Sequence, residues 1–141
     1  MLTEMKALAG QKNMCVLATV AGQKPYCSLM AYVTDDNCEE IYMVTHKSST
    51  KYQNLLQNPA VSLLIDTREK SPRSQVKALT VEGVFCRIEN AEKRRQVTAK
   101  LLQAHPHLET FMRHPEADVF CVKISSFLLL DGLQQAHFET V

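Results

Sequence analysis

Apolar residues along the chain recur mostly at every second position, which is the period of β-strands. Between Tyr26 and Thr34, the odd-numbered residues fall on one face and the even-numbered residues on the other. Shorter apolar runs are bounded by turn residues, such as Gly22 and Pro25. We expect strands in the segments Met14–Val20, Tyr26–Thr34, Ile41–Thr45, Val61–Ile65, Val76–Ile88, Val119–Ile124 and Phe127–Leu130.

Helical periods interrupt this strand pattern. Thr50 and Gln53 have the spacing of a capping box, which predicts that a helix begins at Thr50. Asn90 is a suitable N-cap for a longer helix, which Pro106 ends. The expected helical segments are Leu2–Gln11, Thr50 to Asn58, Ala91 to about His105, and Leu108–Arg113.

This order of strands and inserted helices is typical of a small antiparallel barrel in a mainly β (α+β) fold. The chain has 141 residues, so we expect residues 1–141 to form a single domain. Gly83 lies inside the long strand that begins at Val76. A glycine at such a position predicts a bulge or a close approach of another backbone.

Composition and charge exclude several classes of protein. Sixteen Lys and Arg against fifteen Asp and Glu give a formal charge of +1, which argues against nucleic acid or an anionic membrane as the main partner. The longest apolar run, Phe127–Leu130, is far shorter than the roughly 20 residues that span a bilayer. No secretory signal is visible at the N-terminus, so we expect a cytoplasmic protein.

The five cysteines are scattered and form no C-x-x-C pair, which favours buried, reduced thiols. Cys38 lies in a polar turn and is expected to be the most exposed of them. His105, His107 and His114 are interpreted as solvated residues at helix ends. No carboxylate or cysteine lies near them at the spacing of metal ligands, so we expect no metal site.

The segment from Thr45 to Lys51 carries the clearest candidate chemistry. It places four hydroxyl side chains and two lysines between the end of a strand and the start of a helix. The first amides of a helix are unpaired and carry partial positive charge, so this composition favours a phosphate monoester as ligand. The alternative is a well-capped helix with a solvated loop. His46 either adds charge to such a site or bonds a backbone group.

Five stretches follow one another in a characteristic order. They are the hairpin Val16–Tyr26, the strand Ile41–Thr45 followed after five residues by Lys51, the segment Asn58–Leu64, the strand Thr80–Gly83, and the closing segment Asp118–Leu130. This series resembles the flavin-binding split-barrel proteins related to pyridoxamine 5′-phosphate oxidase, and it covers most of the chain.

The resemblance implies a six-stranded antiparallel split β-barrel with peripheral helices, which forms a homodimer with FMN at the interface. In that family a Ser-x-Lys element holds the flavin phosphate, and the second strand faces the isoalloxazine ring. The implied cofactor-binding residues are Ser28, Leu29, Met30, Val44, Thr45, His46, Ser49, Thr50 and Lys51. Because FMN phosphate carries about two negative charges, we expect further cations from the charged loop at Arg68, Arg73 or Lys77.

The chain also departs from the vitamin-converting oxidases of this family. Ser28 and Val33 stand where those enzymes have an Arg and a Lys, Ala78 stands in place of a Gln, and the chain contains no Trp. Oxidation of pyridoxine 5′-phosphate is therefore disfavoured. The resemblance implies an FMN-dependent oxidoreductase of unknown substrate and electron donor, without an assigned catalytic residue. The alternatives are a haem-binding or haem-degrading protein on the same barrel, and a non-enzymatic flavin-binding module.

Overall fold

Eight strands and four α-helices make up the chain, and the computed structural model describes all of its residues, 1–141. The strands are β1 (Met14–Ala21), β2 (Lys24–Ala31), β3 (Val33–Thr34), β4 (Glu40–His46), β5 (Ala60–Asp66), β6 (Lys77–Arg87), β7 (Ala117–Asp131) and β8 (Gln135–Thr140). The helices are α1 (Leu2–Gln11), α2 (Thr50–Gln57), α3 (Ala91–Ala104) and α4 (Glu109–Arg113), with short 3-10 turns at Arg73–Gln75 and Pro106–Leu108.

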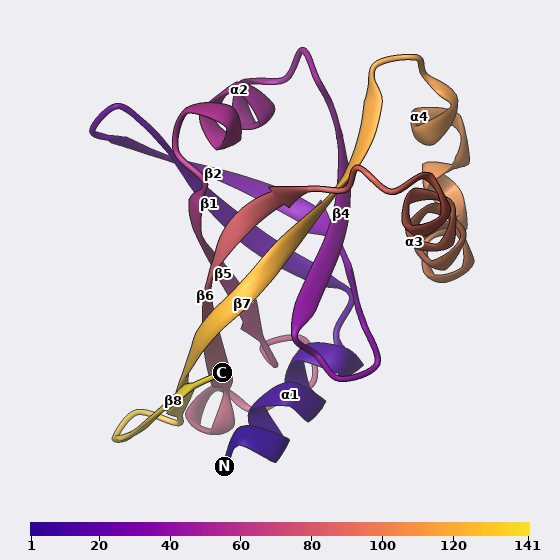
Figure 1. Cartoon of the computed structure of the whole chain (residues 1–141). Helices are drawn as coiled ribbons and strands as arrows, with labels where there is room; N and C mark the ends of the chain where they lie inside the picture. Colours follow the sequence, from indigo (N-terminus) through magenta and orange to yellow (C-terminus); the bar gives the residue numbers. More distant parts are fainter.

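The strands form one antiparallel sheet that curls until its two ends meet (Figure 1). Along the sheet the order is β2-β1-β5-β6-β7-β4-β3. Only Tyr32 separates β2 from β3, so both ends of this order belong to one bent stretch of chain. That stretch pairs first with β1 and then with β4, which closes a six-stranded barrel. The predicted mainly β fold with an antiparallel split barrel is confirmed.

The inside of the barrel is filled by a core of 22 buried apolar side chains. Phe120 and Phe127 of β7 lie at its centre with no exposed surface. Figure 1 shows α1 and α2 at opposite ends of the barrel. Met5 and Ala9 of α1 are completely buried at one end, and each large side chain buried in this way contributes roughly 1.5–3 kcal/mol.

A second, smaller apolar cluster lies outside the barrel, beneath α3. Its members are Tyr42, Val44, Ile88, Val97, Leu101, Val119 and Cys121. An ion pair between Lys93 of α3 and Glu40 of β4, with Nζ and Oε1 2.9 Å apart, ties the helix to the same face. The longest helix has 14 residues, and none of the helices combines the length and apolar character needed to cross a bilayer.

The strand boundaries differ from the prediction at three places. The predicted strand Tyr26–Thr34 is divided at Tyr32, where the chain bends from one neighbouring strand to the other. The two predicted closing strands are one strand, β7, because the break at Ser125 is a bulge and pairing with β6 continues past it. The strand β8 was not predicted. Its sequence, QAHFET, alternates only weakly between apolar and polar residues, and its pairing with β7 holds it as a strand.

The predicted bulge at Gly83 is confirmed. The register between β6 and β7 shifts between Glu82 and Gly83, and the Ser125 hydroxyl donates to the Glu82 carbonyl oxygen at 3.0 Å. A Cβ atom at position 83 would lie 2.5 Å from the Lys123 carbonyl oxygen and 2.7 Å from a Val122 methyl carbon. Only glycine fits there, because the nearest contact is backbone.

We expect Gly83→Ala to lower the free energy of unfolding by about 1–3 kcal/mol, because the added methyl group forces two strands apart. The measurement is urea denaturation followed by circular dichroism. Gly10→Ala is the matched control: it lies in α1, where the new Cβ would meet only the Thr34 hydroxyl oxygen at 4.0 Å, and helix propensity favours alanine. A Gly83→Ala protein as stable as the Gly10→Ala protein would contradict this account of the bulge.

Candidate functional site

The first turn of α2 forms a cradle for an anion. Ser49 is its N-cap and accepts a hydrogen bond from the Tyr52 amide at 3.2 Å. The hydroxyl groups of Ser49 and the buried Thr45 lie 3.1 Å apart. The amides of Thr50 and Lys51 make no hydrogen bond within the protein. Two free amides at a helix N-terminus, beside a lysine, are donors arranged for a negatively charged group.

The predicted capping box at Thr50 is wrong by one residue. The Thr45 hydroxyl holds the Ser49 hydroxyl in place, so Ser49 is the N-cap and has extended backbone (φ −72°, ψ 153°). The helix itself begins at the next residue, Thr50. Gln53 consequently does not complete a capping box and donates from Nε2 to the Lys47 carbonyl oxygen at 2.9 Å. A contact between a strand and the following loop thus overrides the local sequence signal.

The predicted site residues fall into two groups. Thr45, Ser49, Thr50 and Lys51 come together at the start of α2. Val44 is buried on the outer side of β4, beneath α3, because successive side chains on a strand point to opposite faces. The second group, Ser28 to Met30, lies on β2, where Ser28 is half-buried, Leu29 is exposed and Met30 is buried.

His46 also lies on the outer side of β4, away from Thr45. Its ring stacks between Phe111 and His114, with ring centroids 3.9 Å and 4.6 Å apart. Its Nε2 atom lies 3.2 Å from the Phe111 carbonyl oxygen. Of the two roles considered for His46, the bond to a backbone group agrees with this geometry. The residue attaches α4 to the barrel.

The charged loop does not bring cations to the start of α2 within one chain. Arg68 bonds Asp66, with Nε 2.9 Å from Oδ2, at the far end of β5. Lys77 lies 3.9 Å from Asp131 at the same end. Because α2 precedes the first residue of β5, the seven residues of that strand separate the two regions by roughly 20 Å.

A buried polar group that sequence reasoning missed lies beneath the cradle. Asp118 is 5% exposed and accepts a hydrogen bond from the Tyr52 hydroxyl at 2.8 Å. Arg94 of α3 donates to the other carboxylate oxygen at 2.6 Å. Burial, and next the bond to Asp118, raise the pKa of Tyr52, whereas Arg87 acts in the opposite direction. Asp118 lies one position before an apolar run in the sequence, and nothing local marks it as part of the site.

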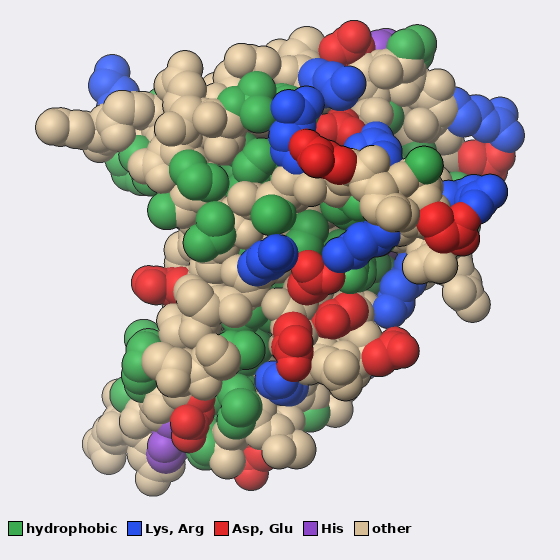
Figure 2. All heavy atoms as spheres, viewed as in Figure 1, with side chains coloured by type: hydrophobic (Ala, Val, Ile, Leu, Met, Phe, Trp, Pro, Cys, Tyr) green, Lys and Arg blue, Asp and Glu red, His purple; other side chains and the backbone are tan.

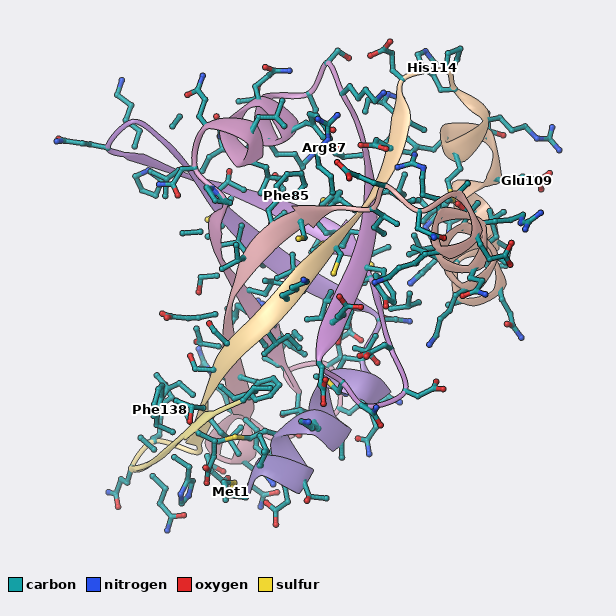
Figure 3. All side chains as sticks on the ribbon, in the orientation of Figure 1. Met1, Phe85, Arg87, Glu109, His114 and Phe138 are labelled. Carbon is teal, nitrogen blue, oxygen red and sulfur yellow. The ribbon has the colours of Figure 1, made fainter.

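Arg87 is a further cation at this end of the barrel. It ends β6, and Figure 3 shows it in the upper part of the molecule, near α2 and the end of β4. It forms no ion pair with a carboxylate. The sequence signal that marks Arg87 is its place at the end of a predicted strand.

A row of side chains crosses the outer face of the barrel from β2 to β8. Cross-strand partners share a face of the sheet, and the register places six residues in line. They are Leu29, Val16, Leu64, Thr80, Leu128 and Phe138. Leu29 is 72% exposed and Phe138 62%. In Figure 2, hydrophobic side chains gather along the left side of the molecule, whereas charged ones concentrate around α3. Such an exposed apolar band is typical of a protein–protein interface.

A hollow of about 390 Å³ opens on this outer face beside β2. Five of its ten lining residues are hydrophobic, Leu29 and Leu64 among them, and its charged lining residues are Lys12, Asp66, Arg68 and Glu69. The volume lies within the range of sites that take small organic ligands. The hollow adjoins the predicted ring-binding strand and the exposed apolar row, so the three features share one face.

Two predictions about single residues are wrong. Cys38 is buried, because the turn that holds it has a positive φ of 50° and directs the thiol into the core, where burial raises its pKa to about 11. Cys27, on the outer side of β2, is the exposed thiol. His105 is buried rather than solvated, and its Nε2 atom lies 2.9 Å from the Tyr32 carbonyl oxygen.

Several solved structures share this fold. A haem-binding protein from Mycobacterium smegmatis is 20% identical, with a TM-score of 0.84; the match covers 97% of this chain but only 56% of that one. HutZ, the haem storage protein of Vibrio cholerae, is 21% identical with a TM-score of 0.76, and the match covers 92% of this chain and 93% of that one. An FAD-binding protein from Mesorhizobium loti is 14% identical with a TM-score of 0.76 and the same coverage. At these identities the likeness shows the fold alone.

The barrel, the free amides at the start of α2 and the exposed outer face define a split-barrel protein. The sequence profile described as pyridoxamine 5′-phosphate oxidase matches residues 1–131. The chain therefore belongs to the pyridoxamine 5′-phosphate oxidase family, as its motifs predicted. No curated protein sequence matches it.

We expect Ser49→Ala to lower the free energy of unfolding by about 1 kcal/mol, because the Tyr52 amide loses its acceptor. The matched control is Asn90→Ala at the N-cap of α3, where the side chain accepts from the Lys93 amide at 2.9 Å. Urea denaturation should give similar losses for both variants. Exchange of the α2 amides should increase in Ser49→Ala only, and unchanged exchange there would contradict the capping geometry.

Proposed function

We propose that the protein binds FMN and acts as a flavin-dependent oxidoreductase on a small molecule other than pyridoxine 5′-phosphate. One observation carries the proposal: the free amides of Thr50 and Lys51 lie beside the Ser49 and Thr45 hydroxyls in a chain of this family. A phosphate monoester fits this donor set, because its oxygens accept several hydrogen bonds and its charge suits the helix terminus.

The rest of the flavin would lie along the outer face of the barrel. Ser28 to Met30 on β2 offer backbone groups for the polar edge of the ring, and the exposed side chain of Leu29 offers an apolar surface beside them. The bound flavin supplies the redox chemistry. The protein's part is to anchor the phosphate and to shield the ring from water.

The exposed row on the same face supports a homodimer. A ring resting beside Leu29 would be open to solvent on its outer side, because that side chain is 72% exposed. A second copy that packs on the row would cover both the apolar residues and the ring. The proposed partner is therefore another copy of this chain, and the proposed cofactor site is complete only in the dimer.

Haem is the second candidate ligand, because two proteins of the same fold are named for haem binding or storage. A haem iron often takes a histidine ligand. Three of the five histidines have hydrogen-bond partners: His46, His105 and His114. A histidine that bonds through one ring nitrogen can still ligate iron through the other, so these contacts exclude none of the five. The absorption spectrum decides, since haem gives one intense Soret band and flavin two broad bands.

We expect Lys51→Gln to weaken FMN binding about tenfold, because the loss of a charged donor to phosphate costs about 1.4 kcal/mol. Riboflavin, which has no phosphate, should bind the variant and the wild-type protein equally. The measurement is quenching of flavin fluorescence on titration. Lys100→Gln on α3 is the control and should change neither affinity.

Failure of the wild-type protein to bind FMN would contradict the proposed function itself. If FMN binds but cannot be reduced and reoxidised in the presence of NADH or NADPH with any acceptor, the protein is a flavin-binding module without enzyme activity. That result would contradict the proposed oxidoreductase activity but not the proposed flavin-binding site.

We expect Leu29→Asp to shift the protein from dimer to monomer, because the substitution places a charge in the middle of an apolar interface. Sedimentation velocity would report the mass. Leu133→Asp is the control: Leu133 is 91% exposed in the turn between β7 and β8 but lies off the row. A wild-type monomer, or a dimer unaffected by Leu29→Asp, would exclude this face as the interface.

A further inference from the structure

The first turn of α2 is tied to the barrel by a closed ring of contacts. Thr45 of β4 and Asp118 of β7 are cross-strand partners, so their side chains lie side by side on the inner face. Thr45 contacts the Ser49 hydroxyl, and Ser49 accepts from the Tyr52 amide. The Tyr52 side chain then returns to Asp118, with hydroxyl and carboxylate oxygens 2.8 Å apart. Both the backbone and the side chain of Tyr52 are thereby held.

The charge of Asp118 needs a counter-charge at this position. A buried carboxylate near the start of a helix opposes the binding of an anion there. Arg94 provides the counter-charge: one nitrogen donates to Asp118 at 2.6 Å and the other to the Ile88 carbonyl oxygen at 3.1 Å. Arg87 lies close enough to the Tyr52 hydroxyl to act on its pKa and adds positive charge at the same end.

The short length of α2 makes these contacts decisive for its orientation. The helix has eight residues, and isolated helices of fewer than about 12 residues are marginal in water. Its direction is therefore set by tertiary contacts. Besides Tyr52, these are the hydrogen bond from Asn54 to the Thr19 hydroxyl at 3.2 Å and the fully buried side chain of Leu55. The turn that carries the free amides is held by the Tyr52 contact with Asp118 and by the contact between the Thr45 and Ser49 hydroxyls.

We propose that Asp118 and Tyr52 are positioning residues that hold the first turn of α2 in the geometry that binds phosphate. This inference rests on the proposed function and extends it to two residues that do not touch the ligand. The hydroxyl of Tyr52 donates to Asp118, and the rest of the ring sits edge-on to Phe85, with centroids 6.1 Å apart. Removal of the hydroxyl therefore breaks the hydrogen bond between the helix turn and Asp118 and leaves the packing of the ring against Phe85 in place.

The test is Tyr52→Phe, with Tyr42→Phe as the matched control. Tyr42 is also buried, and its hydroxyl donates to the Glu40 carboxylate at the same 2.8 Å, but it lies beneath α3. We expect Tyr52→Phe to weaken FMN binding about tenfold and riboflavin binding less than twofold. Tyr42→Phe should lower the free energy of unfolding, measured in urea, by about as much as Tyr52→Phe does. It should bind both flavins as the wild-type protein does.

Hydrogen exchange supplies a readout that needs no ligand. Exchange of the amides of Gln53 to Leu55 should become about tenfold faster in Tyr52→Phe and remain unchanged in Tyr42→Phe. If the two variants bind FMN equally well, or if Tyr52→Phe weakens riboflavin as much as FMN, the proposal is overturned. If the wild-type protein binds neither flavin, the proposed function fails. The exchange measurement then decides by itself whether Tyr52 and Asp118 position α2.

Discussion

Closure of the barrel depends on the bend at Tyr32. At this residue one stretch of chain leaves β1 and joins β4, and without the bend the sheet would remain open with two free edges. All the polar groups of Tyr32 are paired at the bend. Its amide donates to the Asn13 carbonyl oxygen, its carbonyl oxygen lies 2.9 Å from a nitrogen of His105, and its hydroxyl donates to the Ala9 carbonyl oxygen. The residue thus connects α1, β1 and the end of α3, and buried polar groups left unpaired there would cost several kcal/mol.

Closure also places the candidate site. Because the barrel is closed, β4 lies against β7 along its whole length, and Thr45 meets Asp118 at the end that α2 covers. The same alternation that turns Thr45 inward turns Val44 and His46 outward, toward α3 and α4. The end of β4 therefore has two sides. Thr45 contacts the N-cap of α2, whereas Val44 and His46 pack against α3 and α4.

The hydrophobic pattern predicted most elements of this fold, because period and turn signals act over a few residues. The helix Leu2–Gln11 and the N-cap at Asn90 agree with the structure, as does the bulge at Gly83. The errors have different causes. The cap at Ser49 depends on a hydroxyl group four residues away, and the burial of Cys38 depends on a turn with positive φ. The burial of His105 depends on Tyr32, which lies 73 positions away along the chain.

The sequence by itself determined most of the secondary structure, the family and the residue types at the start of α2, since local patterns and ordered motifs carry that information. The tertiary structure decided which of those residues are in contact with one another. Strand pairing joined Thr45 to Asp118, and helix packing brought Tyr52 and Arg94 to the same carboxylate. These contacts join residues up to 73 positions apart, and no local pattern contains them, because they exist only once the barrel has closed.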